Sequence, residues 1–266
     1  MRGADGGVRI DRAGPVARVV LARPAVRNAF DDELIRDLTA AFFEVSGERE
    51  TRVVVLSGDG PAFCAGADIA WMRKAGGYSR DENEADAEKM ALMLRAIDTC
   101  RKPVIAVVHG AAIGGGVGLV AAADIAIASD DAVFSLSEVK LGILPSVISP
   151  YVLRAIGPRQ ARRYFLTGER FDAREALRIG LVHAIASGAE LAASLDRMIA
   201  SLLSSGPEAV RIAKELIGRV AEMSPEEAMA LTVETIADRR ASEEAREGLT
   251  AFLEKRPPSW SPKNPR

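Results

Sequence analysis

The stretch GAAIGGGVGLVAAADIAIAS (110–129) decides how the rest of the sequence is understood. It holds four glycines among residues 114–118, followed by alanines and small aliphatic residues with a single acid, Asp124. Glycine lets the backbone turn sharply and approach a neighbour or a ligand closely. A phosphate-binding loop is one interpretation, but no Gly-Lys-Ser/Thr follows and the spacing fits a dinucleotide fingerprint poorly. Close packing of a helix on a sheet is the other interpretation of the glycines.

The composition indicates one large soluble domain, or one domain with a small appendage. The chain has 266 residues, 48% of them hydrophobic, and a formal net charge of −2 with both signs mixed along its length. Such a balance is atypical of nucleic-acid-binding proteins. No signal peptide and no membrane span is apparent. Cys64 and Cys100 are the two cysteines, and so small a number favours free thiols in a reducing compartment. We therefore expect a cytoplasmic protein, without nucleic-acid or membrane partners.

Strand and helix patterns alternate over most of the chain. Short β-branched runs such as VARVVLARP (16–24), TRVVVLSGDG (51–60) and KPVIAVVHG (102–110) are typical of strands, and amphipathic stretches lie between them. This alternation predicts α/β packing. Strand patterns stop near residue 190 and helical patterns continue to the end. We therefore expect a core over 1–195 and a helical region over 196–266 whose apolar surface would need an oligomer contact.

Two segments that leave predicted strands are rich in small residues. GPAFCAGADIAWM (60–72) follows one strand and HGAAIGGGVGL (109–119) follows another. Turns without large side chains let backbone N–H groups point into a cleft. Two converging N–H groups would form an oxyanion hole, which binds a carbonyl oxygen that gains negative charge.

Five motifs in order extend this interpretation to almost the whole chain. They are RPAVRNAFDDELI (23–35), AFCAGADIAWM (62–72), KPVIAVVHGAAIGGGVGL (102–119), ADIAIASDDAVFSLSEVKLGILP (123–145) and LTGERFDAREALRIGLV (166–182). Together they resemble the enoyl-CoA hydratase/isomerase (crotonase) superfamily. The resemblance implies an α/β fold, a ClpP-like spiral core of ββα turns, followed by a helical trimerisation region. It also implies a homotrimer or a hexamer built as a dimer of trimers.

The resemblance further assigns the ligand and its contacts. The ligand is an acyl-CoA thioester, so coenzyme A belongs to the substrate and no separate cofactor or metal is expected. The N–H groups of Ala67 and Gly115 would hold the thioester oxygen. The remaining substrate-binding positions are Val26, Arg27, Ala65, Asp68, Ile69, Gly114 and Gly118, with Lys255 reaching the CoA phosphates of a neighbouring subunit.

The acid–base residues depart from the pattern of the family. Hydratases of this family use two glutamates, one three residues after the oxyanion glycine and one about twenty residues later. The second is present as Glu138, whereas the first position holds Gly118. One glutamate with a pKa tuned by burial can move a proton at C2 or activate water. Glu138 is therefore the predicted catalytic residue, and Gly118 would leave extra room beside C3 of the acyl chain.

The substrate and reaction stay open between several alternatives. With Gly118 and the segment SVISPYV (146–152), the sequence resembles a subgroup of bacterial hydratases. These act on 3-methylglutaconyl-CoA in leucine breakdown or on isoprenoid-derived glutaconyl-CoAs. Such a substrate carries a distal carboxylate, which Arg73, Lys74 or Arg80 would meet. A Δ3,Δ2-enoyl-CoA isomerase is the alternative within the family. A non-catalytic acyl-CoA-binding protein is the alternative outside catalysis.

Other polar residues have simpler interpretations. His109 and His183 are expected to serve packing, and Asp124 and Asp68 to hydrogen-bond local turns. Cys64 has no His/Asn partner set, so a thiol nucleophile is not predicted. No His/Cys/Asp cluster has the spacing of a metal site.

Overall fold

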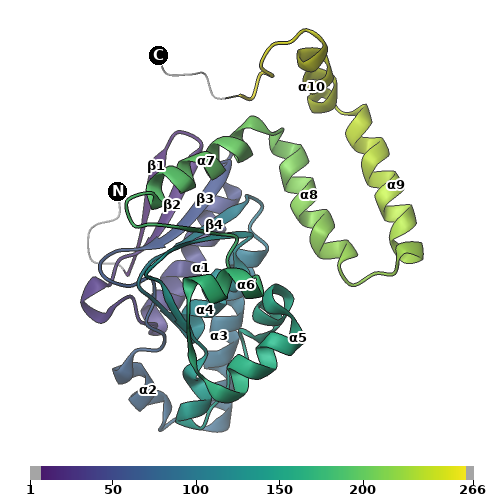
Figure 1. The fold of residues 1–266 in the computed structure, drawn as a ribbon. Coiled ribbons are helices and arrows are strands. Elements are labelled where there is room, and N and C mark those ends of the chain that lie inside the picture. The colour runs from purple at the N-terminus through teal and green to yellow at the C-terminus, as the bar shows by residue number, and fades with distance from the viewer. Residues whose placement is uncertain (1–6, 262–266) are drawn as a thin grey trace.

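The computed structural model describes residues 7–261, which form two sheets flanked by helices (Figure 1). The larger sheet has the strand order β1-β2-β3-β4-β6-β9, and the smaller one β5-β7-β8. Apart from the β1–β2 hairpin, neighbouring strands of the larger sheet run parallel. The strands are β1 Val8–Ala13, β2 Val16–Leu21, β3 Val53–Gly58, β4 Val104–Val108, β5 Ala111–Ile113, β6 Ile125–Ser129, β7 Val133–Ser135, β8 Arg170–Asp172 and β9 Ala184–Ala186.

Helices follow the strands in the order that the sequence pattern predicted. They are α1 Asp32–Gly47, α2 Ile69–Ala75, α3 Arg80–Asp98, α4 Gly115–Ala122, α5 Ser149–Thr167, α6 Ala173–Ile179, α7 Leu191–Ser204, α8 Pro207–Val220, α9 Pro225–Ala241 and α10 Glu243–Leu253, with short 3-10 turns η1 Pro24–Val26 and η2 Ser137–Leu141. The α/β architecture is confirmed, and β4-β5-α4 forms a ββα turn of the expected kind.

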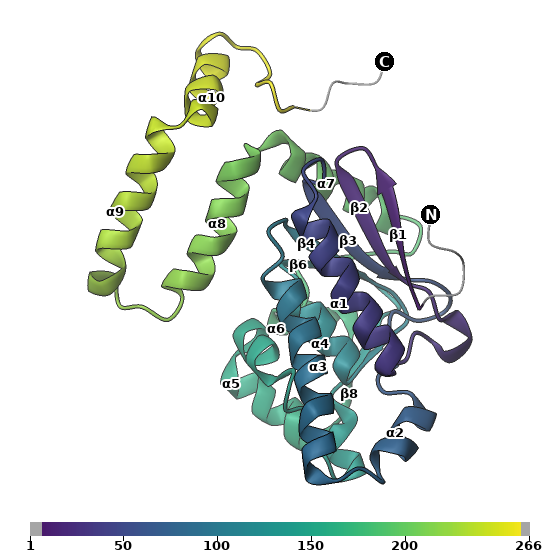
Figure 2. The same cartoon turned by 180° about the vertical axis from the view of Figure 1, so that it is seen from behind.

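The two faces of the larger sheet bury different partners. On β3, Val54 and Leu56 belong to the core shared with α1, α3 and α4, whereas Val53 and Val55 pack with residues of α7. Successive side chains of a strand point to opposite faces, so one short apolar run supplies both cores. Figure 2 shows α1 and α3 on one side of this sheet, with α7 on the other.

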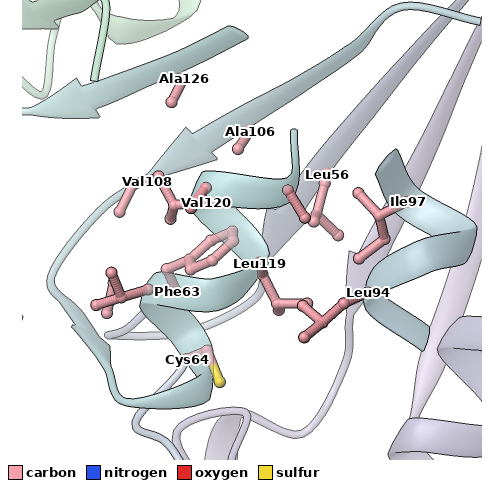
Figure 3. Packing of buried hydrophobic residues seen from close by; sticks show 14 of the residues in the cluster. Leu56, Phe63, Cys64, Leu94, Ile97, Ala106, Val108, Leu119, Val120 and Ala126 are labelled. Carbon is pink, nitrogen blue, oxygen red and sulfur yellow. The ribbon is translucent and has the colours of Figure 1, made fainter. Parts of the chain in front are cut away.

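Helix α4 lies at the centre of the molecule. All of its residues are buried, which explains why the sequence 115–122 has small apolar residues on every side instead of one apolar stripe. Figure 3 shows Leu119 and Val120 of this helix between the sheet residues Ala106 and Val108 and the α3 residue Leu94. Helix α4 is therefore packed between the larger sheet and α3.

Helices α8, α9 and α10 stand away from the sheets (Figures 1 and 2). Helix α7 does not join them, because Leu195, Ile199 and Leu203 are buried against the larger sheet. The expected boundary at residue 195 thus falls inside a helix of the core. The part that stands apart begins with α8, at Pro207. Within residues 7–261, no helix combines the length and the apolar character needed to cross a bilayer.

Candidate active site

The first small-residue turn is fixed by an isolated parallel bridge to Phe30. The Phe30 N–H donates to the Gly66 carbonyl at 2.7 Å, and the Asp68 N–H donates to the Phe30 carbonyl at 2.8 Å. In a parallel bridge the flanking residues make these bonds, so the peptide N–H of the intervening Ala67 points away from Phe30. Gly66 makes the turn possible because its φ is +92° and its α-carbon faces the Ile113 carbonyl closely.

The second turn is tied to the same segment through Cys64. The Cys64 N–H donates to the Ala111 carbonyl and the Ile113 N–H donates to the Cys64 carbonyl, both at 2.9 Å. Gly115 then begins α4, where the first N–H groups have no intrahelical acceptor. Within residues 7–261, neither the Ala67 N–H nor the Gly115 N–H pairs with a protein acceptor. The fold therefore brings two unpaired N–H donors to adjoining turns, as an oxyanion hole requires.

Glu138 lies against the second of these turns. It belongs to η2, and a β-carbon at Gly114 would come within 2.9 Å of its Oε1. Gly114 has a φ of +53° and no side chain, so the carboxyl group can rest on the turn that leads to the Gly115 N–H. The predicted catalytic acid and the predicted oxyanion glycine are thus direct neighbours in space.

The environment of Glu138 suits proton transfer. Its Oε2 is buried and has no hydrogen-bond partner within residues 7–261. Burial raises the pKa of the Glu138 carboxyl above its ordinary value, because desolvation disfavours the charged form. Glu175 is the contrast, since a hydrogen bond from the Arg178 guanidinium lowers the pKa of Glu175 to about 2. Among residues 7–261 no cation pairs with Glu138, so its carboxyl can hold and release a proton nearer to neutral pH.

The room expected at Gly118 is already filled. A β-carbon at this position would overlap Cγ2 of Ile148 and lie 2.9 Å from its Cβ. Ile148 is buried and immediately precedes α5, which packs on α4. The position that carries a glutamate in two-glutamate hydratases is therefore occupied by an apolar side chain from SVISPYV, and the prediction of an open space beside Gly118 is wrong. Gly118 and Ile148, which lie in the two segments that depart from the family pattern, therefore pack against each other.

The rim of the site brings the predicted CoA-contacting residues together. The Ala65 N–H donates to the Arg27 carbonyl at 2.9 Å, which joins the η1 turn to the oxyanion turn. Val26 and Ile69 are exposed beside this junction. Asp68 caps α2 by accepting from the Ala70 N–H at 2.8 Å, so its predicted role in the turn is confirmed.

Asn28 is a positioning residue that the sequence interpretation missed. Its side chain is buried; it accepts from the Arg23 N–H and donates to the carbonyls of Asp59 and Ala62. These bonds join the η1 rim to the loop before the oxyanion turn. Its place within RPAVRNAF was a signal, since a polar residue with a short side chain suits the positive φ of 56° found there.

The predicted cations differ in their availability. Lys74 pairs with Asp32 at 3.0 Å, and Arg80 pairs with Glu84 at 2.8 Å. Arg73 is exposed on α2 and has no ion-pair partner within residues 7–261. Lys255 follows α10, which lies apart from the oxyanion turns of its own chain (Figure 1).

The remaining polar residues serve local structure. The His109 Nε2 lies 2.9 Å from the Gly60 carbonyl, and the His183 Nδ1 lies 3.1 Å from the Ala126 amide nitrogen. Asp124 accepts from the Val104 N–H at 2.7 Å. Burial raises the pKa of the Cys64 thiol to about 12, so a reactive thiolate is disfavoured. No group of three metal-ligating side chains occurs among residues 7–261.

Comparisons with known proteins agree with this geometry. The family model described as enoyl-CoA hydratase/isomerase matches residues 11–263. A short-chain-enoyl-CoA hydratase of Clostridium acetobutylicum is 32% identical over 94% of this chain and 95% of its own length. A crotonyl-CoA hydratase of Syntrophomonas wolfei is also 32% identical, over 93% and 95%.

Solved structures show the same fold. The crystal structure of an enoyl-CoA hydratase from Shewanella pealeana has a TM-score of 0.92 and 42% sequence identity, and the match covers 96% of each chain. The oxyanion turns, Glu138 and this full-length likeness point to one conclusion. The chain belongs to the enoyl-CoA hydratase/isomerase family and is an enzyme of that family.

Proposed function

We propose that this enzyme adds water to, or removes water from, an α,β-unsaturated acyl-CoA with Glu138 as its single carboxylate. The observation that carries the proposal is the buried, unpaired Oε2 of Glu138 beside the turn that presents the Gly115 N–H. The names of the similar hydratases support the same reaction. Coenzyme A is part of the substrate, and the reaction as proposed needs no separate cofactor.

The proposed mechanism uses one proton carrier. The N–H groups of Ala67 and Gly115 hold the thioester oxygen as it becomes an enolate oxygen, aided by the positive N-terminal end of α4. Glu138 takes a proton from water while the water oxygen bonds to C3. The electron pair of the double bond moves to the enolate, and Glu138 then returns the proton to C2. Contacts to CoA along Ala65, Asp68 and Ile69 would hold the reacting carbons in place.

The proposed acyl group is branched and carries a distal carboxylate, as in 3-methylglutaconyl-CoA. The side chain of Ile148 fills the space next to Gly118, so this wall of the site is apolar and favours a methyl branch near C3. Arg73 is the best candidate for the distal carboxylate, because Lys74 and Arg80 already have acidic partners. The support for a branched acyl group is therefore the apolar side chain of Ile148 and not an open space beside Gly118.

Isomerisation of a 3-enoyl-CoA to a 2-enoyl-CoA is the second candidate function. The same observation favours it, since proton removal at C2 and return at C4 require one carboxylate and no water. The two reactions differ in whether water enters the product. They can therefore be separated by substrate and by product mass.

A panel assay tests these alternatives. Crotonyl-CoA, a 3-enoyl-CoA and 3-methylglutaconyl-CoA are compared by kcat/KM with the purified enzyme. Preference for 3-methylglutaconyl-CoA supports the branched-chain hydratase. A product of unchanged mass from the 3-enoyl-CoA, faster than any hydration, identifies an isomerase. Preference for crotonyl-CoA contradicts the proposed acyl group.

We also propose that the enzyme assembles as a homotrimer, or as a hexamer made of two trimers. Helices α8 and α9 contain no buried residue within the single chain, although they carry large apolar side chains. The exposed set on α8, α9 and α10 is Ile217, Met229, Val233, Ile236, Leu249, Phe252 and Leu253. An uncovered apolar surface of this kind is typical of a subunit interface. In such an assembly Lys255 would reach the CoA of a neighbouring subunit.

A further inference from the structure

A pocket lies at the edge of the larger sheet opposite the oxyanion turns. Its floor is formed where β3 and β4 begin, at Arg52 and Pro103, whereas Ala67 and Gly115 follow the ends of these strands. The pocket has a volume of about 190 Å³. Its charged lining consists of Arg49, Arg52, Arg101, Lys102 and Arg211, with Glu208 as the one acid. The five cations come from three separate segments of the chain.

Most of this positive charge is not neutralised. Arg211 is paired with Glu208 at 2.8 Å and with Glu215 at 2.6 Å. Within residues 7–261, by contrast, the side chains of Arg49, Arg101 and Lys102 have no ion pair. Burial lowers the pKa of Lys102, and the neighbouring charge of Arg101 lowers it further. Within residues 7–261, the pocket therefore holds more positive than negative charge, with Glu208 as its one lining acid and Arg211 as the partner of that acid.

Arg52 lines the pocket with a guanidinium group that the chain holds in place. Its Nη1 donates to the Trp260 carbonyl at 2.7 Å, and its Nη2 donates to the carbonyls of Leu203 and Ser205. These bonds fix the plane of the guanidinium group. Its Nε is buried and has no acceptor within residues 7–261. Because that nitrogen is closed off from solvent, Arg52 contributes a fixed positive charge to the pocket. Within residues 7–261, the side-chain donors open to an anion are those of Arg49, Arg101 and Lys102.

We propose that this pocket binds a phosphate-type anion, either inorganic phosphate or the phosphate group of a small metabolite. The volume far exceeds the roughly 10–15 Å³ that one water needs, so it admits a tetrahedral oxyanion and part of the group that carries it. Arginine guanidinium groups match phosphate oxygens with paired N–H donors, and a lysine ammonium adds a point charge. The site is separate from Glu138 and does not depend on the reaction proposed above.

Calorimetric titration with inorganic phosphate at constant ionic strength tests the proposal. The wild-type enzyme is compared with the double variant Arg101→Gln/Lys102→Gln and with the single variant Arg49→Gln. Loss of two charged donors is expected to weaken phosphate binding at least about tenfold. The matched control is Arg159→Gln/Arg162→Gln, which removes two exposed cations from α5 and should leave phosphate affinity unchanged.

The source of the phosphate is distinguished by enzyme kinetics. If the group belongs to CoA, the double variant also raises KM for an enoyl-CoA at unchanged kcat. If the ligand is a separate metabolite, KM is unchanged while phosphate binding is lost.

Three results would overturn the proposal. One is the absence of phosphate binding by the wild type at millimolar concentration, and another is equal binding by the pocket variants and the control. A change in the solution mass of the double variant would instead assign the cations to an acidic surface of another copy of the chain.

Discussion

Helix α4 and helix α9 make opposite use of apolar residues. Every residue of α4 is buried by its own chain, whereas α9 has none buried. The glycines of α4 let Glu138, Phe30 and Cys64 approach from different elements, so the position of the Gly115 N–H is decided within one subunit. Met229, Val233 and Ile236 of α9 are exposed instead. The proposed catalytic turn is thus formed by residues of a single chain, while the exposed apolar residues of α9 are those that the proposed assembly would cover.

The largest expected effect concerns Glu138, which rests on the start of α4. Glu138→Gln should lower kcat about 100- to 10,000-fold, the usual contribution of a general acid–base group. Stability at neutral pH should not fall, because burial raises the pKa of Glu138 and the charged form is the one that the fold disfavours. This penalty is complete above the pKa of the folded state and is lost as the pH falls from there to the ordinary pKa of the unfolded chain. Steady-state kinetics and thermal unfolding measure the two effects.

The pH profile gives an independent check on Glu138. Wild-type activity that needs the carboxylate should decline as the pH falls, with a midpoint above the ordinary value for glutamate of about 4.3. Asp196→Asn, which removes an exposed carboxylate from α7, should change neither kcat nor the profile. Full turnover by Glu138→Gln on every enoyl-CoA would leave the proposed mechanism without its proton carrier.

The second effect concerns assembly through the exposed face of α9. Met229, Val233 and Ile236 follow helical spacing and are exposed in the single chain. Val233→Asp should weaken subunit association by about 2 kcal/mol, the size of an interface hot spot, or roughly 30-fold. Light scattering over a dilution series measures it. Phe43→Asp is the control, because Phe43 is 56% exposed on the core helix α1 while Val233 is 60% exposed. Equal masses for all three proteins would argue against this interface.

The third effect probes the packing of Gly118 on Ile148. Gly118→Ala should destabilise the fold by about 1–3 kcal/mol, the usual cost of overpacking a core. In an Ile148→Ala background the cost should be smaller, because the overlapping methyl group is gone. Urea unfolding of the double-mutant cycle measures this coupling. Gly47→Ala, where the new β-carbon meets no heavy atom within 4 Å, should be close to neutral. Additive losses in the cycle would mean that the two residues do not share this space.

The smallest effect concerns the ion pair that links the two regions. Lys214 of α8 donates to Asp124, which follows α4, at 2.6 Å. Lys214→Gln should cost about 1 kcal/mol, between the values for exposed and fully buried pairs. Arg36→Gln removes the exposed pair with Asp37 and should cost less than about 0.5 kcal/mol. A larger loss from Arg36→Gln in urea unfolding would reverse this order.

The residues of the candidate site were easier to predict from the sequence than the residues that surround them. The α/β order and the two small-residue turns followed from local sequence patterns, whereas Glu138 was assigned through the resemblance to the family. Asn28 lies in one of the five motifs, but two of its three hydrogen bonds reach Asp59 and Ala62, 31 and 34 positions away, and could not be inferred from spacing. The helical boundary was placed at 195 because strand patterns stop near there, yet α7 buries its apolar face on β3 and β6.

The sequence by itself determined which groups are available for chemistry. The glycines at 114–116 can offer backbone N–H donors, and Glu138 can carry a proton, because these properties belong to the residue types. Position 118 holds a glycine, so it offers no second proton carrier. Only the tertiary structure decided what surrounds them. Ile148 fills the space beside Gly118, and Arg52, Arg101 and Lys102 meet at the far edge of the sheet, because packing brings together residues that are distant along the chain.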